Sequence, residues 1–267
     1  MLGAIIGDIV GSRFEWHNRK SKEFAFFHPE CFPTDDSIMT LAVGRALTAY
    51  RRDHADLAQT VVRSMRELGQ AYPFAGYGGR FEIWLYTEHP APYNSFGNGA
   101  AMRVSGCADA ADSLEDAKRL SRIVTGVTHD HPEGLKGAEA TVTAAYLARS
   151  GRSMREIRDF VTEHYYPLDL TLDAIRPGYE FDVTCQGSVP QALEAFFEST
   201  GFEDAIRNAV SIGGDSDTIA AVTGAVAEAF YGIPDDLRQK SLTYLDDRLR
   251  GLLLEFEAQF PCRKPSV

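Results

Sequence analysis

The chain has 267 residues, 44% of them hydrophobic and 24% charged, a composition typical of a globular protein with a sizeable buried core. Its 38 acidic and 27 basic residues give a formal net charge of −11, which disfavours binding to nucleic-acid phosphates. No stretch approaches the ~20 apolar residues that a transmembrane helix needs, so membrane insertion is not expected.

The start of the chain and the cysteines indicate a cellular compartment. The first eight residues include Asp8 and no basic leader, so a secretory signal is not predicted and a cytoplasmic protein is expected. Cys31, Cys107, Cys185 and Cys262 are far apart and form no Cys-x-x-Cys motif. We therefore expect buried free thiols rather than disulfides or a zinc ribbon.

Helical periodicity dominates the chain. The small apolar run at 3–7 predicts a buried helix, with a short strand as the alternative, and Thr34 is expected to cap a helix from 36 to about 52. Strands and helices do not alternate, and no repeat or composition break divides the chain. We predict one all-α domain, a multi-helix bundle, over residues 1–267. Further helices are predicted at 54–70, 114–127, 133–149, 153–165, 189–199, 202–210, 217–231 and 235–256.

The predicted helix at 217–231 is expected to lie at the centre of the bundle. It is small and apolar on most sides, and Gly232 and Pro234 mark its end. The segments 73–80, 90–103 and 166–188 are the long loops in this prediction, and long loops in compact domains are often functional.

Two acidic clusters precede predicted helices. Residues 213–218 read Gly-Gly-Asp-Ser-Asp-Thr, and Thr34, Asp35 and Asp36 precede another apolar run. A helix start needs only one capping oxygen, and adjacent carboxylates repel each other unless protons or a cation neutralise them. If folding brings the clusters together, they predict a shared Mg²⁺ or Mn²⁺ site. Asp and Thr are also ordinary helix-start residues, so spacing alone leaves both interpretations open.

Three further stretches carry candidate ligand-binding groups. Residues 95–103 form a glycine-spaced loop whose backbone N–H groups could cradle a phosphate, although such loops are often simple tight turns. Residues 128–133 combine two histidines with two carboxylates, which suits either a polar ligand contact or a helix start at Pro132. Glu15 is either a general base or a solvated side chain. The aromatic residues of 77–96 could stack on an adenine ring or belong to the core.

Together these stretches resemble the ADP-ribosylglycohydrolase family. The matching motifs occur in the family's order and extend from residue 3 to about 234. They are Gly7-Asp8-Ile9-Val10-Gly11-Ser12 with Glu15, Thr34-Asp35-Asp36, Gly97-Asn98-Gly99-Ala100-Ala101-Met102-Arg103, Thr128-His129-Asp130-His131-Pro132-Glu133, and Gly213-Gly214-Asp215-Ser216-Asp217-Thr218.

The resemblance implies an all-α fold with a binuclear Mg²⁺ or Mn²⁺ centre in a cleft. The matching positions would make the metal ligands Thr34, Asp35, Asp36, Asp215, Asp217 and Thr218. The substrate diphosphate and its ribose would contact Ser95, Phe96, Gly97, Asn98, Gly99 and Arg103, together with His129 or His131. Glu15 would lie at the edge of the metals and would form the catalytic set with Asp36 and Asp215.

The reaction implied by the resemblance is hydrolysis of the glycosidic bond between ADP-ribose and an acceptor. The substrate would be an ADP-ribosylated protein or a small ADP-ribose conjugate. The two metals would hold the ribose hydroxyls and lower the pKa of a bound water, and a carboxylate would take its proton. An anionic pocket would stabilise the positive charge that develops on the ribose. The acceptor linkage and the residue that protonates the leaving group stay open.

Two other functions are compatible with these motifs. The first is a catalytically inactive family member that binds ADP-ribose or has a structural role, and binding without turnover would favour it. The second is a metal-dependent phosphohydrolase, which a generic phosphate ester would reveal. A nucleic-acid substrate is disfavoured by the acidic composition, and a monomer is expected.

Overall fold

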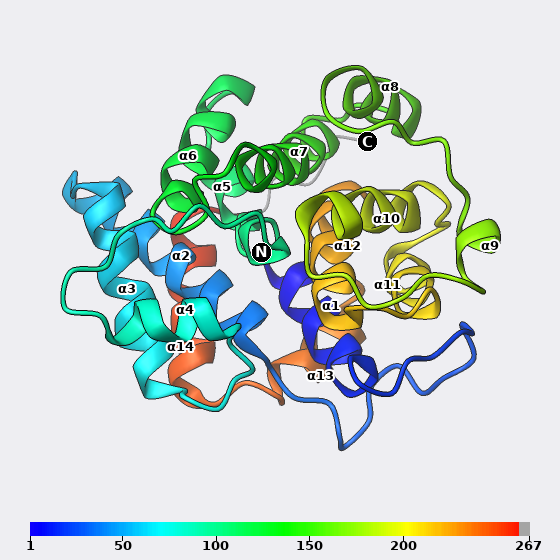
Figure 1. Cartoon of the computed structure of the whole chain (residues 1–267), viewed down its shortest axis with the longest axis horizontal. Helices are drawn as coiled ribbons and strands as arrows, with labels where there is room; N and C mark the ends of the chain where they lie inside the picture. Colours follow the sequence, from blue (N-terminus) through cyan, green and yellow to red (C-terminus); the bar gives the residue numbers. More distant parts are fainter. Residues whose placement is uncertain (262–267) are drawn as a thin grey trace.

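The protein is built from helices (Figure 1). A computed structural model describes residues 1–261, where the only strand-like pairing is an isolated antiparallel bridge between Gly97 and Thr184, so the all-α prediction is confirmed. The helices are α1 (Leu2–Gly11), α2 (Asp35–Asp53), α3 (Leu57–Ala71), α4 (Gly79–Tyr86), α5 (Ser105–Ala110), α6 (Leu114–Gly126), α7 (Pro132–Arg149), α8 (Met154–His164), α9 (Leu172–Ile175), α10 (Cys185–Phe197), α11 (Phe202–Ser211), α12 (Ser216–Tyr231), α13 (Asp235–Leu242) and α14 (Asp247–Gln259), with 3₁₀ turns at Ser12–Phe14 and Asn98–Ala100.

The first helix and α12 form the centre of the bundle, where they lie side by side (Figure 1). Gly3, Gly7 and Gly11 recur every four residues along α1, on the side that meets α12. A Cβ atom on Gly7 would lie 2.0 Å from the carbonyl oxygen of Ala220, and one on Gly11 would lie 2.5 Å from the Cα atom of Asp217. The glycines therefore allow the two backbones to touch, which brings the end of α1 against the start of α12.

The other helices surround this central pair. α12 packs against α7, α10 and α11, while α1 also contacts α2. α2 in turn carries α3 and α14 on the left of Figure 1, and α7 packs against α5, α6 and α8. The apolar opening run lies in α1, and every residue of this helix is buried, so the prediction of a buried helix is confirmed.

The prediction of one helix over 235–256 is wrong. The chain forms α13 and α14 instead, because Asp246 begins a new helix: its side chain accepts a hydrogen bond from the N–H of Leu249 at 2.8 Å. An N-cap carboxylate in the middle of a periodic pattern is the signal that marks this break.

Two other differences concern helix starts and short helices. α10 begins at Cys185, four residues before the predicted start at 189, because the Thr184 side chain caps it by accepting from the N–H of Gly187 at 3.1 Å. Pro190 consequently lies inside the helix rather than at its first turn. α4, α5 and α9 were not predicted, since all three are short, α4 follows a glycine-rich stretch, and α9 lies within the predicted loop 166–188.

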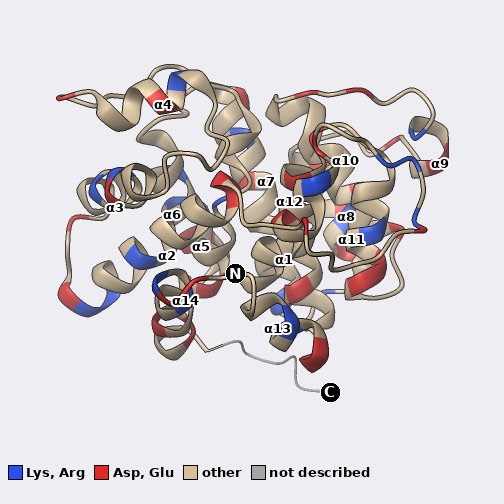
Figure 2. Ribbon diagram, turned by 90° about the horizontal axis from the view of Figure 1, so that it is seen from below, with Lys and Arg blue, Asp and Glu red and all other residues tan. Residues whose placement is uncertain are grey.

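The surface and the thiols agree with the composition. Within residues 1–261, no helix is long and apolar enough to cross a bilayer. Lys and Arg are spread over helices on several sides rather than gathered on one face (Figure 2). Cys31, Cys107 and Cys185 are buried free thiols as expected, and Cys262 lies outside the described residues.

Candidate metal centre and pocket

Asp8 is fully buried in α1, and the start of α2 fixes its carboxylate. Its Oδ2 accepts hydrogen bonds from the N–H groups of Thr34 at 2.9 Å and Ser37 at 3.1 Å, and from the Ser37 hydroxyl. Its Oδ1 accepts from the Thr34 hydroxyl at 2.7 Å. Asp8 thus satisfies free N–H groups at the N-terminus of α2 and joins the two helices. It is absent from the predicted ligands, although a lone carboxylate within an apolar helix was a usable signal.

The acidic start of α2 points toward the same place. Thr34 caps the helix as predicted, with its Oγ1 accepting from the N–H of Asp36 at 3.2 Å. Asp36 is only 3% exposed, and its Oδ2 accepts from the hydroxyl of Thr218 at 3.1 Å. Its other carboxylate oxygen, Oδ1, is buried and has no hydrogen-bond partner. An anionic oxygen buried without a partner is costly, which is a sign that a positive ligand belongs there.

The acidic start of α12 supplies Asp215 and Asp217. Gly213 and Gly214 adopt φ values of +73° and +74°, a left-handed conformation that glycine tolerates best, and they turn the chain into the helix. Asp215, Asp217 and Thr218 are all buried there. The predicted approach of the two distant acidic clusters is therefore confirmed.

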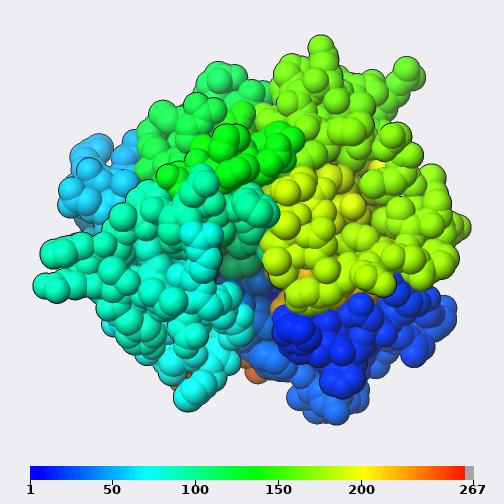
Figure 3. Space-filling model, viewed as in Figure 1, coloured from blue at the N-terminus to red at the C-terminus, as the bar shows by residue number. Residues whose placement is uncertain are grey.

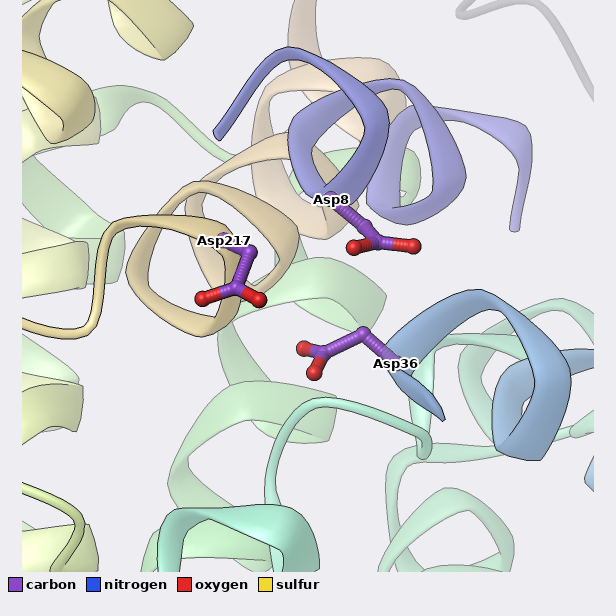
Figure 4. A group of neighbouring side chains, drawn as sticks. All are labelled: Asp8, Asp36 and Asp217. Carbon is purple, nitrogen blue, oxygen red and sulfur yellow. The ribbon is translucent and has the colours of Figure 1, made fainter. Parts of the chain in front are cut away.

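The carboxylates form two overlapping groups, in each of which one oxygen from every member lies within 4.8 Å of the others. The first group is Asp8, Asp36 and Asp217, and the second is Glu15, Asp215 and Asp217. Figure 4 shows the first group pointing toward one another from α1, α2 and α12. Asp217 is common to both groups, so the arrangement resembles two cation positions with one shared carboxylate.

This donor set fits hard divalent cations. All the ligand atoms are carboxylate oxygens, the type that Mg²⁺ and Mn²⁺ prefer, and no imidazole or thiolate joins either group. The carboxylate of Asp36, which has one buried oxygen without a hydrogen-bond partner, points toward this cluster (Figure 4), which supports the fit. Of the predicted carboxylate ligands, Asp35 alone belongs to neither group. The hydroxyls of the predicted ligands Thr34 and Thr218 each bond to a carboxylate of the first group.

Burial and mutual repulsion raise the pKa of these carboxyl groups. Burial raises the pKa of Asp8 to about 6 and, with the nearby charge of Asp8, that of Asp35 to about 8. Burial and the Asp215 charge raise the pKa of Glu15 to about 7. The pKa values of Asp36 and Asp217 also rise well above their usual range, through burial first and neighbouring carboxylates second. A cation bound among these carboxylates would displace the protons that the raised pKa values favour.

Every member of the two groups except Asp8 lines a pocket of about 490 Å³, a size suited to a small ligand. The pocket opens on the face shown in Figure 3, where the surface is hollowed between the cyan and blue segments. Gly76–Phe81, Tyr93, Gly97–Gly99, Phe181 and Val183 line it with the carboxylates. A larger groove of about 1060 Å³ lies between α3 and α6, but none of the clustered carboxylates reaches it.

The predicted glycine loop forms one wall of this pocket with His129. A Cβ atom on Gly97 or Gly99 would lie 3.5 Å from His129 Nε2, so the ring packs against the loop backbone. Burial and then the charge of Arg103 hold the pKa of His129 well below its usual range, which makes the ring neutral. Its Nδ1 lies 3.3 Å from an Arg103 N–H, and a guanidinium can only donate. Nδ1 also lies 2.7 Å from Thr128 Oγ1, and Nε2 is the nitrogen that faces the glycine loop.

Two predicted substrate-binding side chains are engaged with protein groups. Arg103 is 1% exposed, donates to the Thr128 hydroxyl, and has its pKa lowered to about 10 by burial. Asn98 donates from Nδ2 to Asp215 Oδ2 at 2.7 Å and to Ser188 Oγ at 3.1 Å. Both residues line the pocket, but Asn98 orients a clustered carboxylate, a role the sequence did not predict.

The remaining predicted binding residues are divided between the pocket and its surroundings. Ser95 lines the pocket, and its hydroxyl accepts from the N–H of Gly97 at 3.2 Å. Phe96 and His131 pack against each other with ring centroids 5.1 Å apart, and neither lines the pocket. His131 Nδ1 accepts from the N–H of Glu133 at 3.1 Å and caps α7, in line with the helix-start interpretation of this motif.

The chain is similar to known hydrolases that act on ADP-ribose conjugates. The chain is 26% identical to ADP-ribosylhydrolase ARH3 of Mus musculus, with 90% of this chain and 85% of that protein covered. It is 28% identical to the ADP-ribosyl-[dinitrogen reductase] glycohydrolase of Rhodospirillum rubrum, with 80% and 73% covered. It is 26% identical to ADP-ribosylarginine hydrolase Tri1 of Pseudomonas putida (strain GB-1), with 87% and 70% covered.

A solved structure shares the fold. The chain of an ADP-ribosylglycohydrolase-related protein complex superposes with a TM-score of 0.69 at 24% identity, and the match covers 97% of this chain and 95% of that one. The family model described as ADP-ribosylglycohydrolase matches residues 1–263. This protein therefore belongs to the ADP-ribosylglycohydrolase family, whose members hydrolyse ADP-ribose conjugates.

Proposed function

We propose that this protein is a Mg²⁺- or Mn²⁺-dependent hydrolase that cleaves the glycosidic bond between ADP-ribose and an acceptor. The observation that carries the proposal is the pair of carboxylate groups that share Asp217 beside a pocket of ligand size. The relatives named as hydrolases of ADP-ribosylarginine and of ADP-ribosyl-dinitrogen reductase support a modified protein as substrate, and a small ADP-ribose conjugate is the alternative.

The two groups would hold two cations. Asp8, Asp36 and Asp217 would bind one ion, and Glu15, Asp215 and Asp217 the other. When bound, the cations would supply positive charge that lowers the pKa of a coordinated water and orients the ribose hydroxyls. Thr34 and Thr218 would support the first group through their hydrogen bonds to its carboxylates.

The chain's own residues would act on the water and on the sugar. Glu15 lines the pocket at the edge of the second group, where its carboxylate would act as the general base that takes a proton from the attacking water. Asp36 and Asp215 would keep the reacting groups in position. Positive charge develops on the ribose as the glycosidic bond breaks, and the surrounding carboxylates would stabilise it.

The opposite wall would hold the diphosphate. Gly97 and Gly99 have no side chain, so an anion can approach the backbone there closely, and His129 Nε2 faces the same wall. The N–H groups of Gly97 and Asn98 already donate to Ser95 Oγ and to the Val183 carbonyl oxygen, so these bonds hold the shape of the loop. Arg103 also lines the pocket, although it is almost fully buried, and it would supply positive charge there. Burial of that charge strengthens its electrostatic effect on a bound phosphate.

The proposal is tested by release of ADP-ribose from a modified protein and from a small conjugate. Activity should require Mg²⁺ or Mn²⁺ and should fall at least about 100-fold in Asp36→Ala or Asp215→Ala, since each removes a cation ligand. A generic phosphate ester should not be hydrolysed. Full activity of either variant in excess chelator would refute the metal-dependent scheme, and binding of ADP-ribose without turnover would indicate an inactive family member.

A further inference from the structure

Glu15 reaches the second carboxylate group from a segment without regular secondary structure. It follows the 3₁₀ turn Ser12–Phe14, and residues 16–20 are exposed. The other members of the two groups lie in α1 or at the starts of α2 and α12. The ligand oxygens of one ion must lie within about 4 Å of one another. The segment that carries Glu15 therefore needs contacts that hold it in place.

The side chain of Asn18 makes that connection. Its Oδ1 accepts from the N–H of Gly214 at 2.8 Å, and its Nδ2 lies 2.9 Å from the carbonyl oxygen of the same residue. The same Nδ2 also lies 2.8 Å from the carbonyl oxygen of Phe14 and 3.0 Å from that of Glu15. One exposed amide therefore joins the backbone of Glu15 to the residue directly before Asp215.

The glycine pair makes this approach possible. A Cβ atom on Gly213 would lie 2.9 Å from Asn18 Oδ1, and one on Gly214 would lie 2.3 Å from the Tyr179 ring. Both glycines also have left-handed φ values, which other residues adopt at a cost. Lys20 adds two hydrogen bonds to backbone carbonyls of the facing segments, at 2.5 and 2.6 Å. The segment is thus fixed against the start of α12 by side-chain-to-backbone bonds.

The first carboxylate group has separate supports. Asp8 is held by the N–H and hydroxyl groups of Thr34 and Ser37, and Asp36 by the hydroxyl of Thr218. None of these bonds involves residues 15–20. A change at Asn18 should therefore affect the two groups differently.

We propose that Asn18 is a positioning residue for the second cation site, formed by Glu15, Asp215 and Asp217, and that the first site is independent of it. This inference rests on the proposed metal-dependent function. Asn18 acts through the backbone of Glu15 and Gly214, and its own side chain is not a ligand. Loss of its amide frees Glu15 from the α12 start, and the second ion then binds to a less organised set of oxygens.

The test is a Mn²⁺ titration of wild type and Asn18→Ala by calorimetry and by electron paramagnetic resonance. Wild type should bind two ions, and Asn18→Ala should bind one ion unchanged and the other about 10- to 100-fold more weakly, as is usual when a supporting hydrogen bond of a ligand is removed. Activity of the variant should recover as Mn²⁺ is raised, which a general loss of structure would not allow.

A matched control separates this effect from the loss of any exposed amide. Gln70 is exposed and its Nε2 donates to the carbonyl of Leu85 at 2.7 Å, away from both groups, so Gln70→Ala should bind both ions as wild type does. Circular dichroism and thermal unfolding should show that both variants fold, since position 18 is on the surface. Two wild-type affinities in Asn18→Ala would overturn the inference alone, whereas a wild type that binds no Mn²⁺ would overturn the inference and the metal-dependent function together.

Discussion

Alanine in place of Gly7 tests whether the contact between α1 and α12 builds the metal centre. The new Cβ atom would lie 2.0 Å from the Ala220 carbonyl oxygen, and ordinary contact begins near 3.4 Å, so the helices must separate locally by about 1.4 Å. Overpacking of this kind costs about 1–3 kcal/mol, and the better helix propensity of alanine returns at most about 1 kcal/mol. We expect a net loss of about 1–2 kcal/mol in the free energy of unfolding.

The same displacement should weaken cation binding. Asp8 follows Gly7 directly, and its oxygen lies within 4.8 Å of those of Asp36 and Asp217. Ligands of one Mg²⁺ ion lie about 2.1 Å from it, so opposite oxygens are at most ~4.2 Å apart, and a further separation of about 1 Å exceeds what the site can absorb. We therefore expect Gly7→Ala to bind the ion of the first group at least about 10-fold more weakly.

Urea unfolding and Mn²⁺ calorimetry on the same samples measure both effects. Gly251→Ala is the matched control, because Gly251 lies within α14, is exposed, and has nothing within 4 Å of its added Cβ atom. That substitution should stabilise the protein by up to about 1 kcal/mol and leave Mn²⁺ binding unchanged. If Gly7→Ala matched the control in stability and metal affinity, close helix contact would not be what positions Asp8.

Three further predictions follow from the carboxylate cluster. Asp217→Asn should abolish both Mn²⁺ sites in calorimetry, whereas Asp8→Asn should leave one, because only Asp217 belongs to both groups; equal loss in the two variants would contradict the shared ligand. The pKa of Asp8 is raised to about 6 and that of Asp35 to about 8, from 3.8, so the metal-free protein should lose stability as pH rises from about 4 through 8. The increase in Tm caused by saturating Mn²⁺ should accordingly be larger at pH 8 than at pH 5, and an equal increase would show that these groups do not titrate as described. Asn98→Ala removes the 2.7 Å hydrogen bond to a carboxylate of the second group, so it should weaken one Mn²⁺ site about 10-fold, with unchanged affinity as the contrary result.

The sequence predicted the long helices and the meeting of two acidic clusters, since both leave local signals. Periodicity marks α2, α6, α7 and α12, and paired carboxylates before apolar runs mark the ligand segments. It did not predict that Asp8 joins the cluster, because that depends on how α1 and α12 pack. Gly3, Gly7 and Gly11 show a spacing of four in the sequence, but this spacing does not identify α12 as the partner helix.

Side-chain roles in the loops were harder to predict than their location. The 95–103 loop does reach the pocket, but whether Asn98 and Arg103 face a ligand or the protein depends on neighbours distant in sequence, Ser188 and Thr128 among them. The break between α13 and α14 depends on Asp246 competing as a cap against a continuous apolar pattern. Composition and periodicity do not give the relative strengths of local caps and tertiary contacts, so they do not predict which of the two determines the structure.

The contact between α1 and α12 also bears on how the chain is made. Roughly 200 residues separate the two helices, so during synthesis the apolar α1 leaves the ribosome long before its glycine face has a partner. Until α12 has been synthesised, the glycine face of α1 has no native partner and is available for contacts with other apolar surfaces or with a chaperone. The carboxylates of Asp8 and Asp217 cannot yet lie together. Nascent chains shorter than about 230 residues should therefore be prone to aggregation and unable to retain Mn²⁺.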